Sequence, residues 1–176
     1  MFKDFDISSF KKMKPPSNNS FDTSQELKEL NKIPLNKSFV KKFDNIESAF
    51  AKTASDNNIK DYDKKIAAKL IEKSAPVVLS LKKHFNRPRP KELDNKLSNY
   101  EMSSMKTKSY PSGHSVQGVL IGKVLSDKYP KAKSAFNKTA ENISYSRRVA
   151  RAHYKSDSKM GEQLGNSMYK HIKNKI

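Results

Sequence analysis

The sequence predicts a single all-α domain. Apolar side chains recur at three- and four-residue spacing along most of the chain, which is typical of helices that bury one face. No pair of strand-like segments flanks a turn signal, and the chain has only 5 glycines and no tryptophan. Its 176 residues are enough for one domain with a substantial core.

The chain is expected to begin with a flexible N-terminal arm over residues 1–22. Pro15 and Pro16 precede a stretch of serine and asparagine there, a composition typical of loops. The helical domain is expected to fill residues 23–176.

The first helices of this domain follow from their apolar spacing and their end signals. Residues 24–32 favour a helix that Pro34 ends. Residues 37–54 and 61–85 carry longer apolar stripes at helical spacing, and each predicts one helix. Pro76 is expected to kink the second of them.

The second half contains a loop and three more expected helices. Residues 91–110 follow a proline-rich break and are expected to form a loop that can include a short helix. An apolar run after Ser112 predicts a helix that ends near Tyr129, and residues 131–152 and 157–174 predict the last two.

Charge and composition restrict the compartment and the partners. The net charge is +18, of which residues 81–176 carry +14, so this half favours anionic partners such as phosphorylated molecules, nucleic acid or an acidic membrane surface. No cysteine is present, which excludes disulfides and thiolate chemistry. No signal peptide or membrane-length apolar run is visible, which predicts a cytoplasmic or otherwise soluble protein.

Three segments combine residue types that suit chemistry on an anion. In the first, Pro111-Ser112-Gly113-His114 stands at a predicted helix start, where unpaired N–H groups attract anions. A capped helix with an incidental histidine is the plainer interpretation of this segment alone.

The second segment is "KKHFNRPRP", in which Lys82 and Arg89 stand at a proline-locked helix end. Lysine offers a point charge and arginine a planar fork, and both suit phosphate oxygens. Taken alone, it is more often a solvated basic helix end.

The third segment is "SRRVARAHYKSD", in which Arg147 precedes His153 and Asp157 follows the histidine by four residues. A carboxylate at that spacing can hold one imidazole nitrogen and leave the other as a nucleophile or base. A surface ion pair is at least as common for such a spacing.

Together the three segments resemble the tripartite signature of the phosphatidic acid phosphatase type 2 superfamily. That superfamily includes the soluble bacterial class A acid phosphatases and shares its site with the vanadium haloperoxidases. The resemblance implies a single-domain helical bundle of the acid phosphatase and vanadium haloperoxidase type. The positions that match it are Lys82, Arg89, Pro90, Pro111, Ser112, Gly113, His114, Ser146, Arg147, His153 and Asp157.

The resemblance also implies a role for each site residue. His153 is the nucleophile that forms a phosphohistidine, Asp157 orients it, and His114 is the general acid and base. The residues that bind the phosphate oxygens are Lys82, Arg89, Ser112, Gly113 and Arg147. The implied activity is hydrolysis of phosphate monoesters without a metal or cofactor.

Three alternative functions stay open. A vanadate-dependent haloperoxidase would hold vanadate as cofactor on His153, and a lipid-phosphate phosphatase would act at a membrane surface. A basic protein that binds nucleic acid or membranes would explain the charge alone. Under the leading interpretation the partner is a small phosphorylated substrate, with no obligatory nucleic acid, while a homo-oligomer and contact with an anionic membrane stay open.

Other candidate residues are interpreted as structural or solvated. Asp4 and Asp6, like Asp61 and Asp63, form Asp-x-Asp pairs that follow no apolar strand, so they are expected to be surface carboxylates. His84 and His171 are interpreted as solvated residues of a basic face rather than ligands. Three arginines beside the motif positions are expected to extend the basic field without catalysing: Arg87, Arg148 and Arg151.

Overall fold

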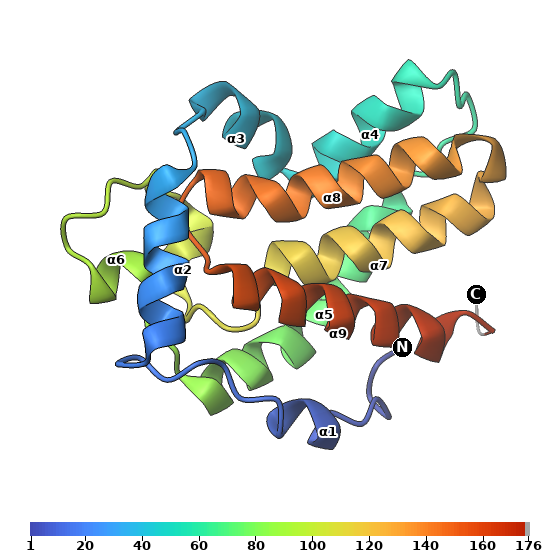
Figure 1. The fold of residues 1–176 in the computed structure, drawn as a ribbon. Helices are drawn as coiled ribbons and strands as arrows, with labels where there is room; N and C mark the ends of the chain where they lie inside the picture. The colour runs from blue at the N-terminus through green and yellow to red at the C-terminus, as the bar shows by residue number, and fades with distance from the viewer. Residues whose placement is uncertain (175–176) are drawn as a thin grey trace.

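The computed structural model describes residues 1–174. All regular secondary structure in this part of the chain is helical, and it contains no strand. Figure 1 shows the helices gathered in one body. The α-helices are α1 (Ser8–Lys11), α2 (Phe21–Lys32), α3 (Lys37–Asp44), α4 (Ile46–Asp56), α5 (Lys65–Phe85), α6 (Pro90–Leu93), α7 (Gly113–Lys128), α8 (Lys133–Val149) and α9 (Lys155–Ile172). Two 3₁₀ helices, η1 (Ser103–Lys106) and η2 (Pro130–Ala132), complete the set.

Helix α7 is the centre of the bundle. It lies between α8 and α9, with α5 behind it (Figure 1). Val116, Leu120, Ile121 and Leu125 are each fully buried, so α7 presents apolar side chains in several directions rather than along one stripe. The sequence pattern predicts this helix and its N-cap Ser112, and the structure confirms both.

Glycines let α9 approach the main chain of α7. A Cβ at Gly161 would lie 2.6 Å from the carbonyl oxygen of Ser112, and one at Gly165 would lie 2.5 Å from that of Val116. Such distances exclude a larger residue unless the helices separate. The start of α9 is therefore fixed closely against the start of α7.

Several helix boundaries differ from expectation, and α2 and α8 have shifted ends as well as the three cases that follow. The single helix expected over 37–54 is two helices, because Asn45 leaves the helical conformation and its side chain caps α4 by accepting from the Ser48 N–H. Helix α5 begins at Lys65 rather than 61, and it continues through Pro76. Helix α9 begins two residues earlier than expected, directly after Tyr154.

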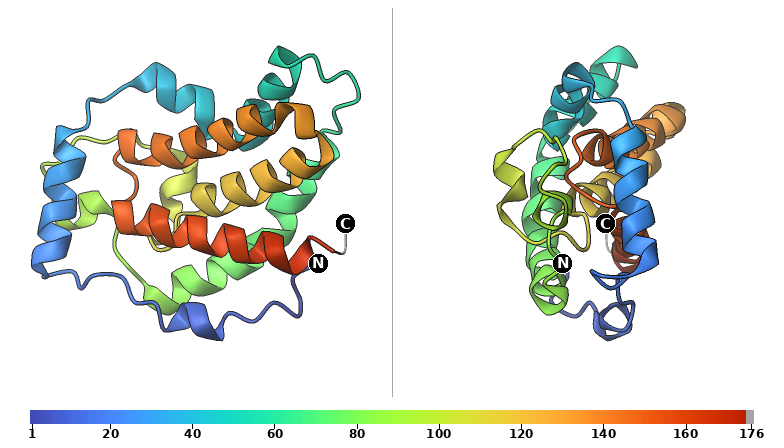
Figure 2. Two further views of the ribbon diagram at one scale, coloured as in Figure 1. Left: turned by 45° about the vertical axis from the view of Figure 1, so that its right-hand side comes forward. Right: turned by 60° about the vertical axis from the view of Figure 1, so that its left-hand side comes forward.

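The segment expected to be a flexible arm contains buried aromatic residues. Phe2 and Phe10 belong to the main hydrophobic core, and α1 and the first residues of α2 fall within residues 1–22. The N-terminus lies beside the end of α9 (Figures 1 and 2). The mobility of this segment stays a prediction.

Helix α2 runs across one end of the bundle, where α8 ends and α9 begins (Figures 1 and 2). The guanidinium of Arg151, in the turn between α8 and α9, donates to the carbonyl oxygens of Asn31 and Ile33 at 3.2 and 3.1 Å.

Across residues 1–174, no helix combines the length and apolar character needed to cross a bilayer.

Candidate functional site

The three sequence segments meet at the end of the bundle that α2 crosses. Lys82 lies in the last turn of α5, Gly113 opens α7, and His153 lies in the turn before α9. Arg147 lies in the last turn of α8, and Arg89 lies directly before α6. Lys82, Arg89, Ser112, Arg147, His153 and Asp157 are all buried.

His153 is held on both of its ring nitrogens. Nδ1 lies 3.0 Å from Oδ2 of Asp157, and Nε2 lies 2.9 Å from Nη1 of Arg89. A guanidinium only donates, so Nε2 must accept and the ring hydrogen must be on Nδ1, where Asp157 accepts it. The side chain is 3% exposed, and its Nε2 lone pair faces the cations.

Asp157 is fully buried and accepts hydrogen bonds from four groups. Oδ2 accepts from the Tyr154 N–H at 3.1 Å, from the Ser109 hydroxyl and from His153, while Oδ1 accepts from Nη1 of Arg87 at 2.7 Å. Burial raises the pKa of Asp157, and Arg87 and these hydrogen bonds oppose that shift. The surrounding donors therefore favour an ionised carboxylate.

The three predicted cations bind oxygen atoms of one segment, residues 104–108. Lys82 Nζ donates to the carbonyl of Lys108. Arg89 Nε donates to the carbonyl of Thr107 at 2.9 Å, and its Nη2 donates to that of Ser104 at 3.3 Å.

The same segment also reaches the third cation. Arg147 Nη2 donates to the Ser104 hydroxyl at 2.9 Å, and its Nη1 donates to the Asp44 carboxylate at 2.8 Å. The oxygens of residues 104–108 thus occupy donors that a phosphate would need. This segment lies in the loop that the sequence predicts over 91–110.

Ser112 and Gly113 form the N-terminus of α7. Ser112 Oγ accepts from the Ser115 N–H at 3.3 Å and from the Ser115 hydroxyl at 2.9 Å. Both are contacts to the oxygen, which leaves the Ser112 hydroxyl hydrogen able to bond an anion. The first N–H groups of α7 have no partner within the helix and carry its partial positive charge.

His114 follows directly in the first turn of α7. Its Nε2 lies 2.8 Å from the main-chain carbonyl oxygen of Asp44, which only accepts, so Nε2 carries a hydrogen. The Asp44 carboxylate lies 3.7 Å from the same nitrogen. Asp44 therefore contacts both His114 and Arg147.

Burial and mutual repulsion lower the pKa of the basic groups in this site. Burial, followed by the charge of Arg89, lowers the pKa of Lys82 to about 7. Burial, followed by Arg147, lowers the pKa of His114 to about 3, and the pKa of His153 is held well below its usual value for the same kind of reason. A bound anion would therefore stabilise the protonated forms of these basic groups.

Four residues that contact the predicted site are not among the residues that the sequence predicts for it. Glu26, Asp44 and Ser109 lie outside the three segments, and Arg87 was expected only to extend the basic field. One available signal concerns Arg87: residues before proline are extended, so Arg87 and Arg89, each before a proline, project to the same side. His84 contacts the Lys11 carbonyl oxygen and the Phe85 ring, and the Arg148 guanidinium lies over the Tyr145 ring.

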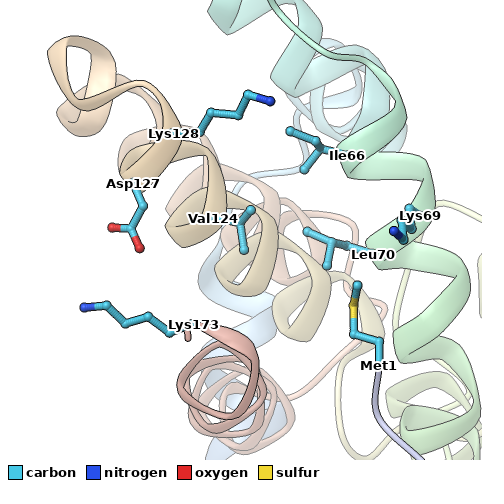
Figure 3. Close-up of a pocket in the computed structure, with 8 residues that line it drawn as sticks. All are labelled: Met1, Ile66, Lys69, Leu70, Val124, Asp127, Lys128 and Lys173. Carbon is cyan, nitrogen blue, oxygen red and sulfur yellow. The ribbon is translucent and has the colours of Figure 1, made fainter. Parts of the chain in front are cut away.

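A largely apolar cavity lies elsewhere, at the far ends of α5 and α7. It measures about 520 Å³, and its lining includes Leu70, Val124 and Met1, with Lys173 at its edge (Figure 3). A second groove, of about 560 Å³, has Arg89 in its wall. Among residues 1–174, no three His, Cys, Asp or Glu side chains gather in a way that could hold a metal ion.

This geometry defines an all-helical domain with a group of buried cationic side chains between helix ends. The PAP2 superfamily profile matches residues 66–172, which is more than half of the chain, so the chain belongs to the PAP2 superfamily. The match covers all three sequence segments, and it confirms the family that they resemble.

Two further similarities agree with this assignment. The chain is 34% identical over 89 residues to a non-specific acid phosphatase of Salmonella typhimurium, covering 49% of this chain and 36% of that protein. It therefore matches little more than a third of the length of this relative. A crystal structure of a transmembrane PAP2-type phosphatidylglycerolphosphate phosphatase from Bacillus subtilis superposes with a TM-score of 0.63 at 16% identity, over 99% of this chain and 96% of that one. This likeness confirms the predicted fold class.

Proposed function

We propose that the protein is a metal-independent phosphatase that hydrolyses phosphate monoesters through a phosphohistidine. The observation that carries this proposal is the alignment of Asp157, His153 and Arg89, because it leaves the Nε2 lone pair facing a group of buried cations. Membership of the PAP2 superfamily and the similarity to an acid phosphatase support it.

In the first step, Nε2 of His153 attacks phosphorus opposite the ester oxygen. The P–N bond forms as the P–O bond breaks, and His114 gives a proton to the departing oxygen. Asp157 accepts from Nδ1 and offsets the positive charge that develops on the ring. Lys82, Arg89 and Arg147 neutralise the charge on the other phosphate oxygens.

In the second step, water attacks the phosphohistidine. His114, now neutral, takes a proton from this water as its oxygen bonds to phosphorus. The P–N bond breaks, and the electron pair returns to Nε2 of His153. Phosphate leaves, and both histidines regain their starting states.

A substrate must first replace the oxygens of residues 104–108. Three carbonyl groups and one hydroxyl of this segment bond the same cations that would bind phosphate. The segment therefore has to move outward when the phosphate group enters. The groove beside Arg89, whose wall includes Met102 and Met105, offers space for the rest of the ester.

The test is hydrolysis of p-nitrophenyl phosphate between pH 4 and 9, with EDTA present, by the wild type and His153→Ala. We expect turnover by the wild type, inhibition by orthovanadate and no turnover by the variant. Activity that EDTA abolishes would overturn the metal-independent mechanism. A wild type that is inert to this ester at every pH would overturn the proposed function.

Three assays address the three alternatives. Bromide oxidation by hydrogen peroxide in the presence of vanadate would indicate a haloperoxidase. Preference for a phosphorylated lipid in vesicles over p-nitrophenyl phosphate would indicate a lipid-phosphate phosphatase. Salt-sensitive DNA binding without hydrolysis would instead indicate a basic binding protein.

A further inference from the structure

A buried ionic cluster lies behind the proposed nucleophile. It consists of Glu26 from α2, Arg87 from the segment after α5, and Ser156 and Asp157 from the first turn of α9. Glu26 lies outside residues 66–172, the part of the chain that matches the superfamily profile. The N-terminal part of the chain thus contacts residues next to the site.

Arg87 joins two carboxylates. Its Nη1 donates to Oδ1 of Asp157 at 2.7 Å, and its Nη2 donates to Oε2 of Glu26 at 3.1 Å. The guanidinium also stacks on the ring of Tyr154 at 3.8 Å. The side chains of Arg87, Asp157 and Glu26 are 1%, 0% and 13% exposed, so solvent screens these charges weakly.

Glu26 also fixes the first turn of α9. Its Oε1 accepts from the Ser156 N–H at 2.6 Å, and its Oε2 accepts from the Ser156 hydroxyl at 2.8 Å. A carboxylate at a helix N-terminus pairs with unsatisfied N–H groups and with the helix dipole. Asp157, the next residue, is therefore held through its neighbour as well as through Arg87.

The charges of this cluster explain why two carboxylates are needed. Arg87 and Asp157 alone would form a neutral pair, and the guanidinium would draw the negative charge of Asp157 away from His153. With Glu26 ionised, the three groups carry one net negative charge. On the other side of the imidazole, the charges acting on His153 are those of Arg89, Lys82, Arg147 and His114. That net charge opposes the three cations where the imidazole must become positive.

We propose that Glu26 and Arg87 are positioning residues for the reaction at His153, and this rests on the proposed function. Arg87 fixes the orientation of the Asp157 carboxylate, so that Oδ2 faces Nδ1 of His153. Glu26 offsets the charge of Arg87 and holds the first turn of α9. Neither residue contacts the substrate.

The test compares Glu26→Gln with Glu29→Gln, which removes an exposed carboxylate from the same helix. We expect Glu26→Gln to lower kcat for p-nitrophenyl phosphate by about 10- to 100-fold, the usual effect of losing a partner that orients a catalytic group. KM and the affinity for orthovanadate should change by less than about threefold, because the phosphate-binding cations are retained. Glu29→Gln should match the wild type, and Glu26→Asp, which keeps the charge, should recover part of the lost rate.

Each outcome decides between the two proposals. Equal kcat for Glu26→Gln and the wild type would overturn the positioning role while the phosphatase function stands. Loss of orthovanadate binding by Glu26→Gln would also overturn it, because the effect would then be a collapse of the pocket. An inactive wild type would overturn the proposed function, and the positioning role with it.

Discussion

Nη1 of Arg89 lies 2.9 Å from Nε2 of His153, and this contact determines the protonation state of the imidazole. The hydrogen must be on Nδ1, and Nε2 keeps its lone pair. The proposed nucleophile is thus prepared by a cation that is also expected to bind the phosphate.

Replacing His153 and replacing His114 should therefore have different effects on the reaction. His153→Ala should abolish both turnover and the base-stable phosphoenzyme that rapid quenching traps, because no nitrogen remains to bond phosphorus. His114→Ala should still form a phosphoenzyme with an aryl ester but turn over about 10²- to 10⁴-fold more slowly, the usual range for a lost general acid and base. His84→Ala, which changes an exposed histidine, is the control and should be fully active. Trapped phosphoenzyme in His153→Ala would show that the nucleophile is another residue.

Anion binding should be coupled to proton uptake. Without an anion, Lys82 has a pKa of about 7 and His114 one of about 3, so both lose charge as the pH rises through those values. A bound dianion raises both pKa values, so binding takes up protons and affinity falls as the pH rises above about 7. Calorimetry with sulfate, which does not titrate in this range, should show this uptake in buffers of different ionisation enthalpy. Lys82→Met should bind sulfate more weakly and lose part of the uptake at pH 8, and a wild type with none would contradict the prediction.

Removing a hydrogen bond between residues 104–108 and the site cations should strengthen phosphate binding. Ser104→Ala removes the hydroxyl that accepts from Arg147 at 2.9 Å in the anion-free site. Because that bond must break before phosphate enters, we expect about 2- to 10-fold tighter binding, the equivalent of one modest hydrogen bond. Ser103→Ala is the control, and equilibrium binding of phosphate is the measurement. Weaker binding by Ser104→Ala would show that its hydroxyl contacts the phosphate instead.

The close contact of α9 with α7 should make Gly165 sensitive to a single methyl group. Gly165→Ala places a Cβ 2.5 Å from the carbonyl oxygen of Val116, and the overlap should outweigh the gain in helix propensity. We expect Tm to fall by about 2–10 °C in a thermal unfolding scan. Gly113→Ala is the control, since its Cβ would meet Val78 at an ordinary 3.5 Å and should leave Tm nearly unchanged. Equal Tm values for the two variants would contradict the packing argument.

Local signals in the sequence predict most of the helices. The cap at Ser112 and the apolar run that follows define α7 correctly, because both act within one helix. The apolar spacing does not predict the break at Asn45, because it continues across that residue. The cap that Asn45 provides depends on the backbone conformation at this position. Periodicity reports which residues face the core and says less about where one helix becomes two.

The same distinction applies to the site. The three segments that resemble the superfamily signature identify the residues that the fold brings together around His153. Glu26 and Asp44 could not be found in this way, because each contacts a residue more than 100 positions away in the sequence. Glu26 pairs with Ser156, and Asp44 pairs with Arg147. The occupation of the cations by residues 104–108 is likewise a product of the tertiary arrangement, and a loop assignment alone does not predict it.

The glycine contacts of α9 have a consequence for how such a protein can diversify. Because main-chain atoms, rather than side chains, set the spacing between α7 and α9, no gradual change of side-chain volume can widen or narrow the distance between the histidines. New substrate preferences have to arise elsewhere. The part of the connecting segment before Ser104, residues 91–103, can change composition without removing the contacts that residues 104–109 make to the site, and it is the part of the chain best suited to supply them.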